Sequence, residues 1–85
     1  MSYYEKVRQA KAVTVGTKQT RKAIERGEAL EVFVATDAEP HVTEKIIALC
    51  KLKGIPVRYV DSMRALGEAC GIDVGAAAVA ITKER

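Results

Sequence analysis

The chain has 85 residues, enough for one domain with a modest core, and its 48% hydrophobic and 29% charged residues are typical of a globular protein rather than a disordered chain. Its longest strongly apolar stretch, residues 75–81, is too short to span a bilayer, and the N-terminal MSYYEKVRQ lacks the apolar core of a secretory signal, so we expect a cytoplasmic protein. The formal net charge is +3, but residues 1–30 hold seven Lys or Arg against three acids, which favours a polyanionic partner, with a solvated basic face as the alternative.

Three elements are predicted in the first third of the chain. Residues 2–10 have the pattern of a short helix, and residues 12–15 have that of a short strand. A second helix lies within GTKQTRKAIERG, residues 16–27. It follows Gly16 and ends at Gly27, because glycine best tolerates the left-handed conformation found after many helices.

This second helix carries its positive charge at the unusual end. A helix N-terminus bears about half a positive charge and favours acids, yet Lys18, Arg21 and Lys22 occupy the first turns and no acid occurs before Glu25. Lys18 and Lys22, four residues apart, also repel each other. A phosphate among these side chains would reverse that repulsion, and the N–H groups of the helix end would add donors. We therefore predict an anion site here, with a solvated helix carrying incidental cations as the alternative.

The rest of the chain alternates strands with helices, which predicts an α/β fold, a three-layer α/β/α sandwich around a small, mixed, four-stranded sheet. The continuous apolar run that starts at Leu30 is typical of a central strand covered on both faces. Pro40 suits the first turn of the next helix, and Ser62 can cap the last one. The expected elements are a strand at 30–35, a helix from Pro40 to Gly54, a strand at 57–60, a helix at 63–70 and a strand of small and β-branched residues at 77–82.

A glycine-flanked loop follows the last predicted helix. Gly71 ends that helix, and Ile72 and Val74 lie on either side of Asp73 before Gly75. Apolar side chains in such a loop either tuck into the core or form a small apolar surface. If exposed, that surface would suit the face of an unstacked RNA base.

Residues suited to catalysis or metal binding are sparse. GTK at residues 16–18 lacks the spacing of a phosphate loop, and the single histidine, His41, has no second ligand at zinc-site spacing. Cys50 and Cys70 form no disulfide framework or metal motif, and we expect both to be small buried hydrophobic residues. We therefore expect no enzyme activity, no cofactor and no metal. Three aspartates lie at element ends, where Asp commonly serves turns and caps: Asp37, Asp61 and Asp73.

Four stretches, in this order and spacing, resemble the kink-turn-binding ribosomal protein family, of the large-subunit seven-Ae and thirty-e type, in its small bacterial YbxF-like form. They are GTKQTRKAIERG, VFVATDAEP, ALCKLKGIPV and LGEACGIDVGAAAVAI, and they cover nearly the whole chain. The resemblance implies one α/β/α domain over residues 1–85 that recognises kink-turn RNA at two tandem sheared G·A pairs and stabilises the bend. The RNA would be a ribosomal RNA or riboswitch kink-turn, and the protein a monomer with the ribosome as a further partner.

The resemblance also implies site residues. After a glycine the family has Thr-Asn-Glu, two further residues and Lys, and Gly16, Thr17 and Lys22 match this motif as they stand. Lys18 and Gln19 replace the Asn and Glu that contact guanine edges. Gln19 keeps an acceptor oxygen but loses the charge, and Lys18 cannot accept a hydrogen bond, so both departures bear on affinity and base discrimination. The other expected contacts are Arg21, at a phosphate, and the loop of Gly71, Ile72, Asp73 and Val74, with Ile72 and Val74 against a protruding nucleotide.

Two other functions are alternatives to RNA binding. A protein-interaction module of the same fold would use GIDVG as a docking surface and bind no RNA. A small enzyme would use Cys70 as a nucleophile, and rapid labelling of Cys70 by an alkylating agent in the folded protein would support it.

Overall fold

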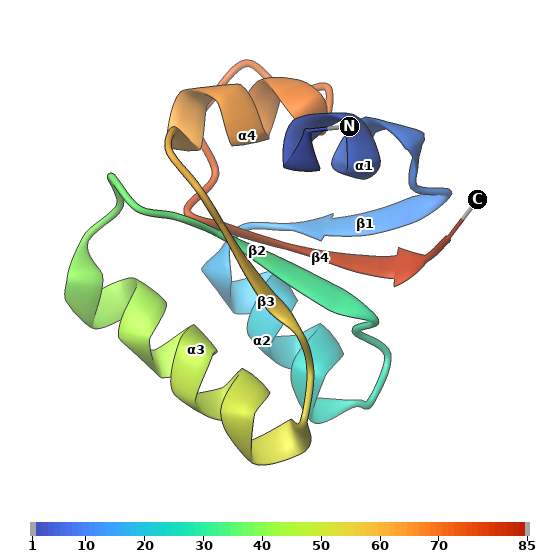
Figure 1. Ribbon diagram of the computed structural model, residues 1–85, viewed down its shortest axis with the longest axis vertical. Helices are drawn as coiled ribbons and strands as arrows, with labels where there is room; N and C mark the ends of the chain where they lie inside the picture. The colour runs from blue at the N-terminus through green and yellow to red at the C-terminus, as the bar shows by residue number, and fades with distance from the viewer. Residues whose placement is uncertain (1, 85) are drawn as a thin grey trace.

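The computed structural model describes residues 2–84, and over these residues four helices alternate with four strands (Figure 1). The α/β fold predicted from the sequence is confirmed, and each element lies within one or two residues of its expected bounds. The elements are α1 Tyr3–Gln9, β1 Ala12–Val15, α2 Thr17–Glu25, β2 Glu31–Ala35, α3 Pro40–Lys53, β3 Val57–Val60, α4 Met63–Ala69 and β4 Ala78–Lys83.

The sheet is mixed, with the strand order β1–β4–β2–β3. β4 runs antiparallel to both of its neighbours, β1 and β2, whereas β3 pairs with β2 in parallel. β4 is therefore central although it is the last element of the chain. Its successive residues Ala78, Val79 and Ala80 are fully buried, and their small size lets helices pack closely on both faces.

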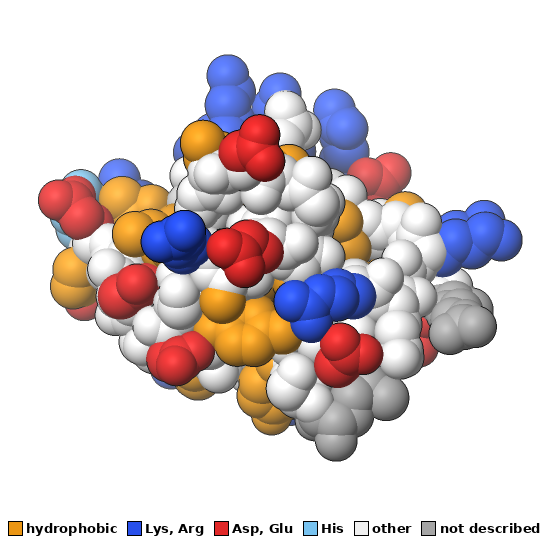
Figure 2. Space-filling view, turned by 90° about the horizontal axis from the view of Figure 1, so that it is seen from above, with side chains coloured by type: hydrophobic (Ala, Val, Ile, Leu, Met, Phe, Trp, Pro, Cys, Tyr) orange, Lys and Arg blue, Asp and Glu red, His pale blue; other side chains and the backbone are white. Residues whose placement is uncertain are grey.

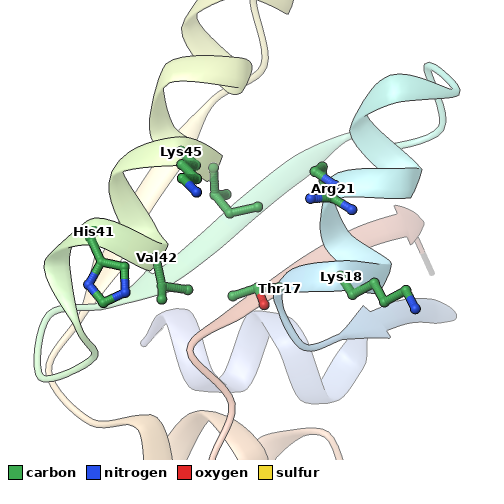
Figure 3. A pocket seen from close by; sticks show the side chains of 7 residues that line it. Thr17, Lys18, Arg21, His41, Val42 and Lys45 are labelled. Carbon is green, nitrogen blue, oxygen red and sulfur yellow. The ribbon is translucent and has the colours of Figure 1, made fainter.

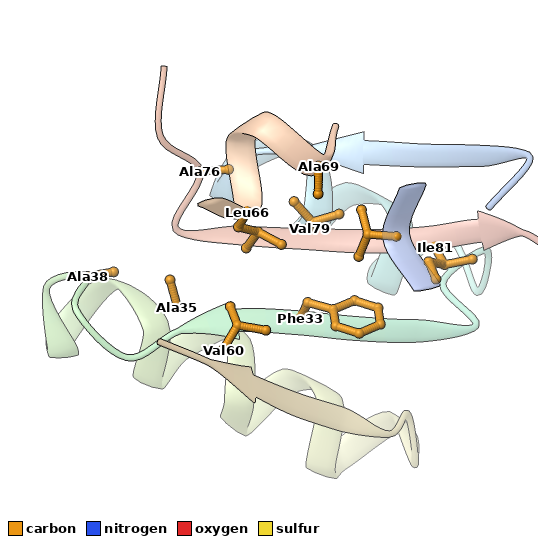
Figure 4. Packing of buried hydrophobic residues seen from close by; sticks show 10 residues of the cluster. Phe33, Ala35, Ala38, Val60, Leu66, Ala69, Ala76, Val79 and Ile81 are labelled. Atoms are coloured by element: carbon orange, nitrogen blue, oxygen red, sulfur yellow. The ribbon is translucent and has the colours of Figure 1, made fainter. Parts of the chain in front are cut away.

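Two helices cover each face of the sheet (Figure 1). α1 and α4 pack over Phe33, Val79 and Ile81, and Figure 4 shows Leu66 of α4 among these side chains. α2 and α3 pack on the other face, where Ile24 and Cys50 join alternate residues of β2 and β4. Every residue of β2 is buried, and residues 32–35 are the part of the apolar run that is covered on both faces as predicted. No helix within residues 2–84 combines the length and the apolarity that a membrane span requires.

Two predictions about the strands were wrong. Leu30 lies outside β2 and is 49% exposed, and the strand begins at Glu31, which is only 4% exposed. Glu31 can be buried because Lys6 Nζ lies 2.7 Å from its Oε1 and Arg58 Nε lies 2.6 Å from its Oε2. The last strand starts one residue later than predicted, at Ala78, although the Ala77 carbonyl oxygen already accepts a hydrogen bond from the Ala35 N–H.

The two cysteines are free and lie on opposite faces of the sheet. Cys50 is fully buried on α3, as predicted. Cys70 packs against the core but is only partly buried, so the prediction of a buried residue is met only in part. It is the C-cap of α4, at the rim of the core, where Gly71 turns the chain back.

The loops that carry the predicted site residues meet at one end of the sheet. Because β4 is antiparallel to β1 and β2, the carboxyl ends of those strands lie beside the start of β4. The Gly16 N–H donates to the Ala78 carbonyl oxygen at 2.9 Å, and the Ala35 N–H donates to that of Ala77 at 2.9 Å. The N-terminus of α2 and the chain entering β4 are therefore direct neighbours.

Candidate nucleic-acid interface

α2 begins directly after β1, with a first turn that has no side-chain cap and no acid. Gly16 is its N-cap residue and has a φ of +93°, a conformation that residues with a Cβ rarely adopt. The first intrahelical bond joins the Thr20 N–H to the Gly16 carbonyl oxygen at 3.0 Å. The N–H groups of residues 17–19 therefore point out of the helix end, where they can donate to an anion or to a base edge.

The buried face of α2 determines which of its polar side chains reach solvent. Thr20, Ala23 and Ile24 are buried, and the Thr20 Oγ1 lies 3.3 Å from the Thr14 Oγ1 on β1. This anchoring turns the predicted contact residues toward the outside. Lys18, Gln19 and Arg21 are exposed, whereas Gly16, Thr17 and Lys22 are half-buried.

Part of α2 faces α3 across an open cavity of about 390 Å³ (Figure 3). The prediction from sequence missed the contribution of α3, because a whole strand separates the two helices along the chain. The sequence feature that could have indicated this contribution is the pair His41 and Lys45, which lie four residues apart on a helix whose first turn contains no acid. The cavity is lined by Thr17, Lys18 and Arg21 from α2 and by His41, Val42, Lys45 and Ile46 from α3.

The loop after α4 presents one apolar side chain and partly buries another. Val74 is 68% exposed, whereas Ile72 is half-buried. The apolar surface considered from the sequence is therefore formed mainly by Val74. Gly71 and Asp73 are exposed on the same loop.

Close packing against α4 holds this loop in place. The Ile72 N–H donates to the Gly67 carbonyl oxygen at 3.1 Å, and the Ala76 N–H donates to that of Met63 at 3.0 Å, so the loop runs back along the helix. A Cβ at Gly67 would stand 2.0 Å from the Val74 carbonyl oxygen. Gly67 thus positions the exposed loop, a role that sequence reasoning missed. In the sequence, the only indication of this role is that a glycine lies within a predicted helix.

Two of the aspartates at element ends hold this region together. The Asp37 Oδ1 accepts a hydrogen bond from the Met63 N–H at 2.8 Å, so the loop after β2 caps α4 together with the helix's own Ser62. Asp61 accepts a hydrogen bond from the Tyr4 hydroxyl, which joins α1 to the end of β3. The expectation that aspartates at these positions serve caps and turns is confirmed for Asp37.

The thiols lack the properties of a nucleophile. Burial raises the pKa of Cys50 to about 11 and also raises the pKa of Cys70, so both remain protonated at neutral pH. Among the residues that the structure describes, no three His, Cys, Asp or Glu side chains come together to hold a metal ion. What the site offers is N–H donors, cations and a small apolar surface, which suit binding of an anionic, base-containing ligand.

A sequence model of the Ribosomal protein L7Ae/L30e/S12e/Gadd45 family matches residues 1–85. The chain belongs to this family. The resemblance drawn from four sequence stretches is thereby confirmed. Within the L7Ae family, an RNA-binding protein of Halalkalibacterium halodurans is 60% identical over 80 residues, which cover 94% of this chain and 98% of that protein. RNA-binding protein YbxF of Geobacillus stearothermophilus is 54% identical with the same coverage.

A solved structure with a more distant sequence has the same fold. The Giardia lamblia 15.5kD RNA binding protein superposes with a TM-score of 0.86 at 30% sequence identity. The superposition covers 96% of this chain and 72% of that one. The arrangement of helices and sheet in that protein is therefore shared by nearly all of the present chain.

Proposed function

We propose that this protein binds kink-turn RNA at two tandem sheared G·A pairs and stabilises the kinked form. The observation that carries the proposal is the uncapped, acid-free N-terminus of α2, where exposed Lys18 and Gln19 surround outward-facing N–H groups. Family membership supports RNA as the ligand, as do the RNA-binding relatives. The target would be a ribosomal RNA or riboswitch kink-turn, bound in the cytoplasm by residues 1–85 as one monomeric domain.

The side chains of α2 divide between base recognition and phosphate binding in this proposal. Gln19 offers both a donor and an acceptor to the edges of the G·A pairs, and Lys18 adds donors beside it. Arg21 and Lys22 bind phosphates, which position the RNA without reading its sequence. Gly16 and Thr17 bring the backbone N–H groups close to the RNA.

The loop of residues 71–74 provides the second contact. Val74 packs against the base of a protruding nucleotide, with the half-buried Ile72 beside it. Gly71 and Asp73 give the loop its shape at the same surface. Because the loop leads into β4 next to Gly16, one RNA can reach both contacts.

The charges explain how such a protein would stabilise a bend. A kink brings phosphates of two RNA stems close together, and their repulsion opposes the kinked state. Cations placed at this point lower the repulsion, so the protein binds the kinked state more tightly and shifts the equilibrium toward it. The same phosphates would relieve the repulsion among Lys18, Arg21 and Lys22.

The test compares a kink-turn RNA with the same RNA in which the G·A pairs are changed to Watson–Crick pairs. We expect tighter binding to the kink-turn, and a plot of log affinity against log salt concentration with a slope of about −2 to −5, since a few phosphates are contacted. Equal affinities would leave only nonspecific attraction. Absence of binding to either RNA, together with a stable complex with another protein, would support an interaction module instead.

A further inference from the structure

The cavity between α2 and α3 contains positive charge from both helices. Arg21 and Lys45 reach toward it from facing helices, whereas Lys18 lines it with its stem and extends away from α3 (Figure 3). The lining includes no Asp or Glu. Two cations therefore share a cavity that offers them no carboxylate.

Within residues 2–84, neither Arg21 nor Lys45 belongs to an ion pair. Glu39, the acid that directly precedes α3, pairs with His41 instead, with 3.3 Å between Oε2 and Nε2. The charge of Arg21 and Lys45 is thus available to a ligand. Only four Lys or Arg side chains among the described residues have carboxylate partners: Lys6 and Arg58 pair with Glu31, Arg8 with Glu5, and Arg64 with Glu68. What distinguishes Arg21 and Lys45 from the other unpaired cations is that they line the same cavity from two helices.

The floor of the cavity is apolar and its edge carries a hydroxyl group. Ile46 is only 3% exposed and Val42 is half-buried. The Thr17 side chain lies between Val42 and the start of α2 (Figure 3). A nucleic-acid backbone fits this chemistry, because its phosphate oxygens can meet the two cations while its sugar carbons cover the apolar floor.

We propose that Arg21 and Lys45 together bind one backbone phosphate of the RNA in this cavity, so that the interface extends from α2 onto α3. The inference rests on the proposed function and adds to it a contact from a helix that contributes to neither of the two contacts described above. An RNA strand bound to the N-terminus of α2 would continue between the N-terminal halves of the two helices.

The first test uses Lys45→Gln, with Lys51→Gln as the matched control, since Lys51 is an exposed lysine in the last turn of the same helix. We expect Lys45→Gln to weaken binding of kink-turn RNA by about 3- to 10-fold and to flatten the salt slope by about 1. It should weaken binding to the Watson–Crick RNA by a similar factor. Lys51→Gln should change neither the affinity nor the slope. If the two variants behave alike, Lys45 binds no phosphate.

A second test identifies the phosphate itself. A neutral methylphosphonate replaces one RNA phosphate at a time, and the affinity ratio of wild type to Lys45→Gln is measured at each position. At the bound phosphate this ratio should fall to about 1, and the ratio for Arg21→Ala should fall at the same position. The methylphosphonate already removes the contact between the phosphate and the cation, so removing the cation as well costs no further affinity. A ratio that stays constant along the RNA would overturn the proposal.

Two further outcomes distinguish failure of the phosphate contact from failure of kink-turn recognition. If wild type binds both RNAs equally, kink-turn recognition fails, yet a methylphosphonate position that removes the Lys45 effect would still support the phosphate contact. If inorganic phosphate shifts the NMR signals of Thr17 and Lys45 while Lys45→Gln leaves RNA affinity unchanged, the cavity binds a free anion and the RNA assignment is wrong.

Discussion

Lys18, Arg21 and Lys22 violate a local rule, and the violation was the most informative feature of the sequence. Cations near a helix N-terminus oppose the helix dipole and repel one another, so they lower the stability of the helix by itself. Such local costs without local compensation commonly mark functional positions. In the structure the start of α2 has no side-chain cap, and Lys18 lies exposed in its first turn. Lys22 lies in the last turn of this short helix, so the expectation that it belongs to the first turns was wrong.

Gln19 and Arg21 should have separable effects on RNA binding. Gln19→Ala is expected to cost about 1–3 kcal/mol on kink-turn RNA and to reduce its discrimination from Watson–Crick RNA, because a base contact carries sequence information. Arg21→Ala should weaken both RNAs by similar factors and flatten the salt slope. The measurement is the affinity of each variant for both RNAs at two salt concentrations.

Lys18→Ala in the same experiment shows whether Lys18 contacts a base or a phosphate. A donor to guanine O6 or N7 behaves like Gln19, whereas a phosphate contact behaves like Arg21. If Gln19→Ala preserves both affinity and discrimination, the base contact that the family resemblance assigns to Gln19 is wrong.

Val74 should contribute apolar contact without contributing to stability. Replacing it by Asn is expected to weaken kink-turn binding by about 1 kcal/mol, because the side chain is exposed in the free protein and loses apolar burial only in the complex. Leu52→Asn is the matched control, since Leu52 is 80% exposed at the far end of α3. Equal effects of the two variants on RNA affinity would show that the loop does not contact the RNA.

At the scale of elements, periodicity and end signals predicted the helices and strands closely. Gly27 has the left-handed φ expected after α2, and Ser62 caps α4 through its side chain. The start of β2 could not be predicted in the same way. Glu31 is buried because Lys6 and Arg58 converge on it from two other elements, and no local pattern reports such a partnership.

Gly67 should be intolerant of a side chain although it lies in a helix. Gly→Ala in a helix ordinarily stabilises by up to about 1 kcal/mol, but here the new Cβ would collide with the Val74 carbonyl group. We therefore expect Gly67→Ala to lower the free energy of unfolding by about 1–3 kcal/mol and to weaken RNA binding by moving the loop. Chemical denaturation measures the first effect. The exposed neighbour variant Glu68→Ala serves as control, and a stabilised Gly67→Ala would contradict this packing.

At the scale of the whole molecule, the order of the strands decides which residues meet. α/β alternation predicted the layers, but it did not specify that β4 lies between β1 and β2. That placement brings the start of β4 next to Gly16, and the packing of α2 against α3 brings Lys45 opposite Arg21. The two motifs of the candidate site could therefore be predicted one by one, whereas the proposed contact from α3 required the tertiary structure.

Glu31 connects α1, β2 and β3 and should make stability depend on pH. Burial raises the pKa of Glu31, but hydrogen bonds and charge attraction from Lys6 and Arg58 outweigh burial and leave the pKa below its ordinary value of 4.5. Because the folded-state pKa is lower, the ionised carboxylate stabilises the protein at pH values above the ordinary pKa. This stabilisation is lost as the pH falls from that value through the folded-state pKa.

Glu31→Gln removes this contribution. We expect it to lower the free energy of unfolding at pH 7 by about 1–3 kcal/mol and to reduce the loss of stability between pH 5 and pH 3. Glu44→Gln, at an exposed position of α3, should change neither. Urea denaturation across this pH range measures the free energy of unfolding. If this free energy changes with pH in the same way for wild type and Glu31→Gln, the ion pairs of Glu31 do not stabilise the fold.

The most direct measurement of RNA recognition is an amide NMR map of the protein titrated with kink-turn RNA and, separately, with its Watson–Crick counterpart. We predict that kink-turn RNA shifts the signals of residues 16–19 and 72–74 most strongly, because their N–H groups and side chains form the contact. The Watson–Crick RNA should produce smaller shifts, confined to the basic side of α2 and the facing part of α3. Kink-turn-induced shifts concentrated at the opposite end of the sheet, around Gly54, or identical maps for the two RNAs would contradict the proposed mode of binding.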